Sequence, residues 1–265
     1  RARLFAPAST TRTEAAKLPS TTPLRRGLCT RVHVAGVGLT DFVRPGARPW
    51  TFVDMVEEAT GGALRMAGVD VRAIDFVVGS YVKGESTATQ RAVYPLLGHS
   101  GVPVLNINNN CASGSAALYT ARRLIQARAA QCVLVVGFER MQAGALEKAE
   151  DGQPHPLDSH IAALRGFAEY HDEPLAPWMF ACAAREYAQR HRLPADAFAL
   201  VAHKNHAHGR ANPNGFSRRS FTLDQIMRMK MVVHPLTVLQ CSPPCEGASA
   251  AVLCSSDFLH AHRLG

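Results

Sequence analysis

The stretch Leu105–Thr120, LNINNNCASGSAALYT, decides the fold of this chain. An apolar strand ends in three asparagines, Cys111 follows, and a helix is predicted over 112–129. A cysteine at a helix start lies near unpaired backbone N–H groups and the positive end of the helix dipole, which favour a thiolate. The small residues after it predict close approach of a ligand and a helix that crosses a crowded interior. We predict a nucleophile of acyl transfer at Cys111; a buried structural cysteine is the alternative.

Apolar runs and helical periodicity alternate on both sides of this stretch. The order βαβαβαβ predicts an α/β fold with a mainly parallel sheet that helices cover on both faces. The alternation stops after residue 139, where prolines and most of the histidines gather. Strands are expected over 31–39, 74–82, 102–108, 132–138 and 247–256, and helices over 51–67, 90–97 and 112–129.

The domain organisation follows from this change of pattern. We predict a basic tail over 1–29, a core domain over 30–139 and 236–265, and an inserted domain over 140–235. The tail is rich in Arg, Ser and Thr and nearly free of acids, which is typical of a mitochondrial transit segment. We therefore expect a mitochondrial protein; a disordered arm of no consequence is the alternative interpretation of the tail.

Composition excludes several classes of protein. The 265 residues are 47% hydrophobic and 19% charged, as in globular domains, and no run approaches the roughly 20 apolar residues of a membrane span. Of the net charge of +8, residues 1–27 carry six basic residues and one acidic residue, so the body has no electrostatic case for nucleic acid. Seven cysteines without paired spacing suit a reducing compartment.

The motif NNNCASGS followed by Ala-Ala-Leu resembles the nucleophile motif of the thiolase superfamily, and most closely the thiolases of the sterol carrier protein 2 (SCP2) type. GVGLTDF (Gly36–Phe42) and LTVLQCSPPCEGASAA (Leu236–Ala251) match the same family. The resemblance runs in order from about Arg31 to Gly265. Further matches lie at Gln90–Ala92, Val136–Glu139, Ala176–Pro177 before Met179–Phe180, and Lys204–His206.

This resemblance implies a five-layered α/β/α/β/α thiolase fold of two similar halves, with a loop domain inserted in the first. Our chain matches the N-terminal βαβαβαββ half, which carries a mixed, mainly parallel five-stranded sheet, and the loop domain. The family forms dimers or tetramers with the strand before the nucleophile at the interface, so a homodimer is expected. Since relatives also occur in peroxisomes, that compartment is the alternative to mitochondria.

The family reaction assigns a role to Cys111. The cysteine attacks the 3-oxo carbon of a 3-ketoacyl-CoA, acetyl-CoA leaves, and free CoA takes the acyl group from the thioester. CoA is thus implied as a substrate, and no tightly bound cofactor is implied. A thioester intermediate lowers each barrier because a thiolate is both a strong nucleophile and a good leaving group.

The second half of the family pattern is expected to be absent. There a histidine of a Gly-His-Pro motif, a cysteine of a Cys-x-Gly motif and an oxyanion hole complete the site. No Gly-His-Pro occurs here, and the Cys-x-Gly spacing of Cys245–Gly247 lies within the stretch that matches the first half of the family. His99 follows Gly98 but precedes Ser100. Because the base and the oxyanion hole supply most of the rate enhancement, the chain alone is expected to be nearly inert. Truncation, proteolysis and a natural short form all stay open.

Five residues are implied as contacts of CoA or its acyl chain. Arg218 aligns near the nucleotide, where a guanidinium suits adenine and phosphate. Trp178 and Met179 align with the pantetheine and acyl tunnel. Ser242 and Pro243 align with a turn at pantetheine, where the proline removes a backbone N–H. A solvated Arg218 and a core role for Trp178 and Met179 are the alternatives.

The other cysteines and the histidines predict no metal site. Zinc would need a standard ligand spacing, which Cys241, Cys245, His260 and His262 do not have. Inert core cysteines are predicted at positions 132, 182 and 254. The predicted function is an acyltransferase of the SCP2-thiolase type. The alternatives are a thiolase-like protein that binds CoA or lipid without catalysis, and a condensing enzyme of the ketoacyl-synthase branch.

Overall fold

A computed structural model describes residues 31–141 and 157–264, except 167 and 172. The predicted tail over 1–29 lies outside the described residues. The described chain forms two compact units: the sheet unit comprises 31–141, 213–216 and 244–264, and the helical unit comprises 157–212 and 217–243. Residues 236–243 thus group with the helical unit, whereas the sequence-based division assigned them to the core domain.

The sheet unit is built on one five-stranded sheet with the strand order β1-β7-β4-β2-β3. Neighbours β4, β2 and β3 run parallel, whereas β7 runs antiparallel to both β1 and β4. Four strands therefore point one way and one opposes them, which confirms the expected mixed, mainly parallel sheet. The bounds are β1 Val32–Leu39, β2 Phe76–Ser80, β3 Val104–Ile107, β4 Cys132–Arg140 and β7 Glu246–Ser255.

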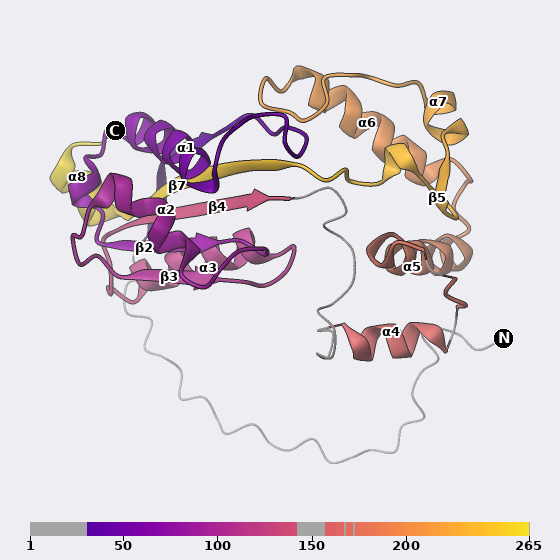
Figure 1. The fold of residues 1–265 in the computed structure, drawn as a ribbon, viewed down its shortest axis with the longest axis horizontal. Coiled ribbons are helices and arrows are strands. Elements are labelled where there is room, and N and C mark those ends of the chain that lie inside the picture. Colours follow the sequence, from indigo (N-terminus) through magenta and orange to yellow (C-terminus); the bar gives the residue numbers. More distant parts are fainter. Residues whose placement is uncertain (1–30, 142–156, 167, 172, 265) are drawn as a thin grey trace, which may run out of the picture. The chain divides into compact units, whose positions relative to one another are not determined.

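Helices cover both faces of this sheet (Figure 1). One face packs against residues of α1, α2 and α8, and the other against Ala117, Ala121 and Ile125 of α3. The three predicted helices are confirmed, with ends that differ by at most three residues: α1 Phe52–Ala67, α2 Ala88–Leu97 and α3 Ser113–Gln126. Helix α8 Ser256–His262 and a short 3-10 turn over Val71–Ala73 were not predicted.

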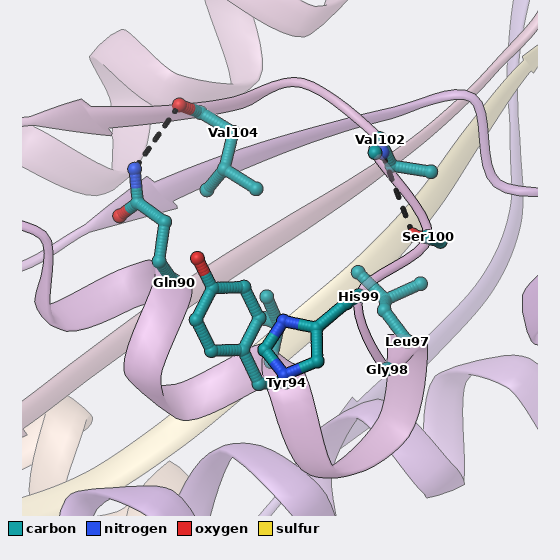
Figure 2. A pocket seen from close by; sticks show the side chains of 10 residues that line it. Gln90, Tyr94, Leu97, Gly98, His99, Ser100, Val102 and Val104 are labelled. Atoms are coloured by element: carbon teal, nitrogen blue, oxygen red, sulfur yellow. Dashed lines mark hydrogen bonds between the residues drawn. The ribbon is translucent and has the colours of Figure 1, made fainter.

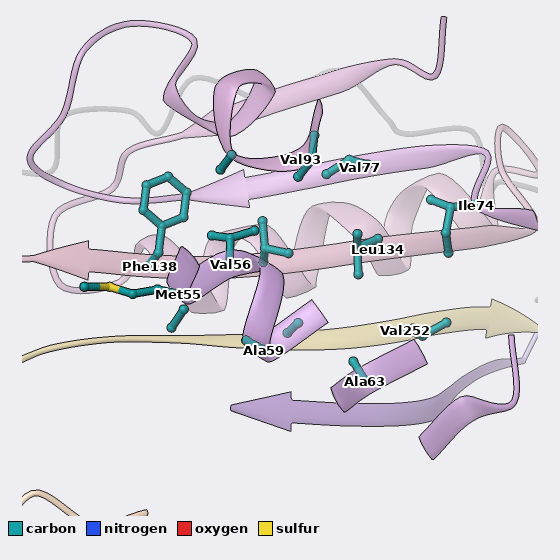
Figure 3. Packing of buried hydrophobic residues seen from close by; sticks show 14 of the residues in the cluster. Met55, Val56, Ala59, Ala63, Ile74, Val77, Val93, Leu134, Phe138 and Val252 are labelled. Atoms are coloured by element: carbon teal, nitrogen blue, oxygen red, sulfur yellow. The ribbon is translucent and has the colours of Figure 1, made fainter. Parts of the chain in front are cut away.

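Helix α1 lies unusually close to β1, because glycines of the strand face small residues of the helix. A Cβ on Gly38 would lie 2.1 Å from the carbonyl oxygen of Ala59 and 2.4 Å from the nitrogen of Ala63. The helix also runs without a break through Gly61 and Gly62, which the sequence pattern marked as a weak point. Its fully buried Met55, Val56, Ala59 and Ala63 pack with Leu134 and Val252 of the sheet (Figure 3).

The helical unit has a smaller core of its own. Trp178 of α5 is 1% exposed and packs with Ala181, Cys182 and Val233. The Trp178 indole donates a hydrogen bond to the carbonyl of Glu169 at 3.0 Å. The elements are α4 Asp158–Arg165, α5 Leu175–His191, α6 Ala197–Ala211, α7 Leu223–Arg228, β5 Met231–Val233, β6 Leu236–Thr237 and a 3-10 turn over Val238–Gln240. None of the helices that the structure describes is long and apolar enough to cross a membrane.

Candidate active site

Polar residues gather where the strands end, along the carboxyl-terminal edge of the sheet. Parallel strands β2, β3 and β4 all end at this edge, and the antiparallel β7 begins there. Ligands of open α/β sheets bind outside the carboxyl ends of the strands. Cys111 follows β3 at this edge, and Glu139 and Arg140 end β4 there.

Cys111 lies on a tight turn between β3 and α3. Its side chain is exposed, and α3 begins two residues later at Ser113. The preceding Asn110 adopts a left-handed backbone conformation with φ of 48°, which asparagine tolerates better than most residues. The thiol of Cys111 lies 3.7 Å from the side-chain oxygen of Asn110. The predicted position at a helix start is confirmed, and the exposed side chain does not fit the alternative of a buried structural cysteine.

Side chains of the turn bond to its own backbone. The buried Ser113 hydroxyl accepts the N–H of Asn109 at 2.8 Å and donates to the carbonyl of Asn110 at 2.6 Å. The Asn108 amide accepts the N–H of Asn110 at 3.1 Å and donates to the carbonyl of Val82 at 3.1 Å. These bonds hold the turn in one conformation, which presents Cys111 outward.

The small residues after Cys111 serve two different purposes. Ala117 and Ala121 are fully buried and let α3 pack directly on the sheet. By contrast, Ala112, Gly114 and Ser115 are exposed, and a Cβ on Gly114 would meet no atom within 4 Å. The predicted crowding is therefore present on the sheet side of α3, and within the described residues the side next to Cys111 is open.

The five other cysteines within the described residues differ sharply from Cys111. Cys132 and Cys254 are fully buried and face each other across β4 and β7. Burial raises the pKa of Cys132 to about 12, with smaller contributions from Cys254 and Asp75, and burial raises the pKa of Cys254 to about 11. Burial also raises the pKa of Cys182, Cys241 and Cys245. Their thiols are therefore poor nucleophiles near neutral pH.

This contrast makes a direct prediction for labelling. With iodoacetamide at pH 8, we expect Cys111 to be alkylated first among the six cysteines that the structure describes, because it is exposed and only thiolates react. Cys132 and Cys254 should react at least about 100-fold more slowly, since their thiolates form only near pH 11 to 12. Peptide mass spectrometry of timed samples measures the order. Labelling of Cys132 as fast as Cys111 in the native protein would contradict the buried placement.

The residues implied as CoA contacts all belong to the helical unit, whereas Cys111 belongs to the sheet unit. Trp178 lies in the core of its unit, and Met179 packs against that core half-buried. Arg218, Ser242 and Pro243 are exposed. The core alternative describes the place of Trp178 in this structure; contact of these five residues with CoA stays a prediction.

The residues considered for metal binding do not form a cluster. Within the described ranges, no three His, Cys, Asp or Glu side chains come together as metal ligands would. A ring nitrogen of His203 lies 2.7 Å from the carbonyl of Phe221, and one of His206 lies 2.9 Å from the carbonyl of Leu239. These ring nitrogens are therefore engaged with the backbone.

The sheet unit also has a cleft of about 380 Å³ away from Cys111. It lies between the end of α2 and the start of β3, whereas Cys111 follows the end of β3. The rings of Tyr94 and His99 lie beside each other there, with centroids 5.2 Å apart (Figure 2). This cleft is therefore separate from the carboxyl-terminal edge of the sheet, where the Cys111 turn lies.

Fold and turn together point to one family. The model of the family "Thiolase, N-terminal domain" matches residues 32–257, which include the whole sheet and the Cys111 turn. The chain belongs to the thiolase family. Among curated relatives, sterol carrier protein 2 of Gallus gallus is 40% identical over 88% of this chain, and that of Homo sapiens is 40% identical over 92%. This chain spans only 43% and 45% of the length of those relatives.

Solved structures agree on the fold. Human mitochondrial 3-ketoacyl-CoA thiolase in complex with CoA matches with a TM-score of 0.66 and 19% identity, over 90% of this chain and 68% of that one. An Ltp2–ChsH2(DUF35) aldolase matches with a TM-score of 0.67 and 20% identity, over 88% of this chain and 58% of that one. Since one fold carries a thiolase and an aldolase, the likeness fixes the architecture and not the reaction.

Sequence reasoning missed the residues that hold the turn. Asn108, Ser113 and Glu139 were quoted as parts of motifs and were given no role of their own. The signal for Asn108 and Ser113 was local, because short polar side chains beside a turn commonly bond to its backbone. Nothing local could have identified Glu139, whose partners Val82 and Lys83 lie more than 50 positions away.

Proposed function

We propose that this chain carries the nucleophile half of a thiolase-type acyltransferase, with Cys111 as the acyl carrier. The Cys111 thiolate attacks the 3-oxo carbon of a 3-ketoacyl-CoA, and the bond between carbons 2 and 3 breaks. The departing acetyl-CoA carbanion takes up a proton, and the shortened acyl group stays on Cys111 as a thioester. The thiol of a second CoA then attacks that thioester and releases acyl-CoA and the free cysteine.

The observation that carries the proposal is the exposed thiol on the turn before α3, in a member of the thiolase family. Two relatives support the reaction class, because acetyl-CoA acetyltransferases of Methanothermobacter thermautotrophicus and Methanocaldococcus jannaschii are 28% identical to this chain. Within the described residues, the hydrogen-bonding partner of the Cys111 thiol is Asn110, and no histidine bonds to it. A base from elsewhere therefore has to complete the site for rapid turnover.

Incubation of the 265-residue chain with acetoacetyl-CoA tests the acyl-carrier role. We expect peptide mass spectrometry to find one acetyl group per chain, on Cys111, and added CoA to remove it. Steady thiolysis by the chain alone should be about 1,000-fold or more below that of a complete thiolase, because the family pattern assigns the base and the oxyanion hole to the half that this sequence does not match. If Cys111 reacts with iodoacetamide but never carries an acetyl group, the acyl-carrier role is wrong.

A second candidate function is binding of CoA or lipid without catalysis. The names of several relatives favour it, since they are called sterol carrier protein 2 and, in Caenorhabditis elegans, non-specific lipid-transfer protein-like 2. Saturable binding of CoA by calorimetry, combined with no acetyl transfer to Cys111, would select this function over the first.

Assembly and location are proposals as well. Strand β3 is an edge of the sheet, and its Leu105 and Asn106 are exposed. An exposed edge strand can pair with another chain, which supports the homodimer that the family resemblance implies. A mitochondrial location, with the peroxisome as alternative, rests on the composition of the first 29 residues and on relatives.

A further inference from the structure

A chain of hydrogen bonds leads from the end of β4 to the Cys111 turn. It begins at Glu139, which is half-buried next to the last residue of β4. One carboxylate oxygen accepts the N–H of Val82 at 2.9 Å, and the other accepts the N–H of Lys83 at 3.2 Å. The carboxylate thus fixes two successive peptide groups of the loop that follows β2.

The carbonyl of Val82 is the next link. It accepts a hydrogen bond from the Asn108 amide at 3.1 Å, so the loop after β2 holds the first residue after β3. The side-chain oxygen of Asn108 in turn accepts the N–H of Asn110 at 3.1 Å. Asn110 has the left-handed conformation that sets the direction of the chain at Cys111. Three neighbouring strands, β4, β2 and β3, therefore hold the turn through side chains.

We infer that Glu139 is a positioning residue for Cys111: its carboxylate fixes Val82 and Lys83, and Val82 fixes the Asn108 amide on which the Cys111 turn is built. None of these hydrogen bonds joins Glu139 to Cys111, so Glu139 acts through the loop that follows β2. That this positioning serves acyl transfer rests on the proposed function. That Glu139 positions the turn rests on the hydrogen bonds alone.

Holding both peptide groups requires both carboxylate oxygens of Glu139. Two N–H donors from adjacent residues need two acceptors, and a hydrogen bond to an ionised acceptor is roughly twice as strong as one between neutral groups. Glutamine keeps the length and one acceptor but presents an NH₂ group to the second donor. Glu139→Gln should therefore release one peptide group, and Glu139→Ala should release both.

Two measurements on the 265-residue chain report the position of the turn. The first is hydrogen exchange of the Asn110 amide, which Asn108 protects. The second is the rate of Cys111 alkylation by iodoacetamide. With Glu139→Ala we expect Asn110 exchange to accelerate about tenfold and Cys111 alkylation to change by about threefold to tenfold, the range expected for one or two hydrogen bonds. Glu139→Gln should give an intermediate effect on both.

Controls separate positioning from loss of structure. Cys132 and Cys254 are fully buried in the same sheet, so they must stay unlabelled in every variant that is folded. Glu85→Ala is the matched control, because this exposed carboxylate lies in the same loop and makes no hydrogen bond or ion pair with the described residues. It should leave both rates unchanged. If Glu139→Ala also labels Cys132, the comparison is made with Glu139→Gln.

A double-mutant cycle with Asn108→Ala tests the route. If Glu139 acts through Asn108, the double variant should match Asn108→Ala alone, because the link is already broken. Independent effects that multiply in the double variant would overturn the inference, as would unchanged Asn110 exchange in Glu139→Ala and Glu139→Gln. If the double variant matches Asn108→Ala but acetoacetyl-CoA does not acetylate Cys111, the proposed function is wrong and the positioning role of Glu139 still holds.

Discussion

Replacing Cys111 with serine is expected to abolish formation of the acyl-enzyme. The acetyl group found on the native chain after incubation with acetoacetyl-CoA should fall from one per chain to none. Any thiolysis should fall by about three orders of magnitude or more, because a serine hydroxyl without an adjacent base is a poor nucleophile. Intact-mass spectrometry and the loss of acetoacetyl-CoA absorbance measure the two effects.

Cys241→Ser is the control for this experiment. Cys241 is a half-buried thiol of the helical unit whose pKa is raised by burial, so its loss should leave acetylation unchanged. Acetyl transfer that survives in Cys111→Ser but is lost in Cys241→Ser would identify Cys241 as the acyl carrier and contradict our proposal.

Gly38→Ala is expected to destabilise the sheet unit by about 3 kcal/mol or more, or to prevent its folding. The added methyl would lie 2.1 Å from a backbone oxygen and 2.4 Å from a backbone nitrogen of α1, and neither atom can rotate away. Strand and helix would have to separate along their whole contact. Urea unfolding followed by circular dichroism measures the loss.

Gly61→Ala is the matched control in the facing helix. A Cβ there would approach only the flexible end of Arg65, at 3.1 Å. Alanine in place of glycine inside a helix should therefore stabilise the protein by about 0.5–1 kcal/mol. Similar stabilities of Gly38→Ala and the native chain would show that α1 and β1 are not as closely packed as described.

Much of the sheet unit could be predicted because its signals are local. Apolar strands bounded by glycines and polar turns alternate with helical periodicity, so β1 to β4 and α1 to α3 were expected within a few residues of their observed bounds. The place of β7 between β1 and β4 comes from the structure alone. The resemblance implied only a mixed five-stranded sheet, and the order was not predicted because an apolar run alone does not state which strands it will join.

The candidate site divides in the same way. Cys111 was identified from consecutive residues, whereas Glu139 and Val82 enter the site only because β4 and β2 lie side by side. Trp178 shows the converse: the alignment suggested a contact with CoA, and packing with Val233, 55 positions later, makes it a core residue of the helical unit.

By itself, the sequence determined that a thiol follows a strand and opens a central helix, because strand, turn and helix signals are properties of neighbouring residues. Only the tertiary structure decided how that thiol is held and how near α1 can come to Gly38. Those features depend on contacts between residues far apart in the chain, and such contacts leave no periodic pattern in the sequence.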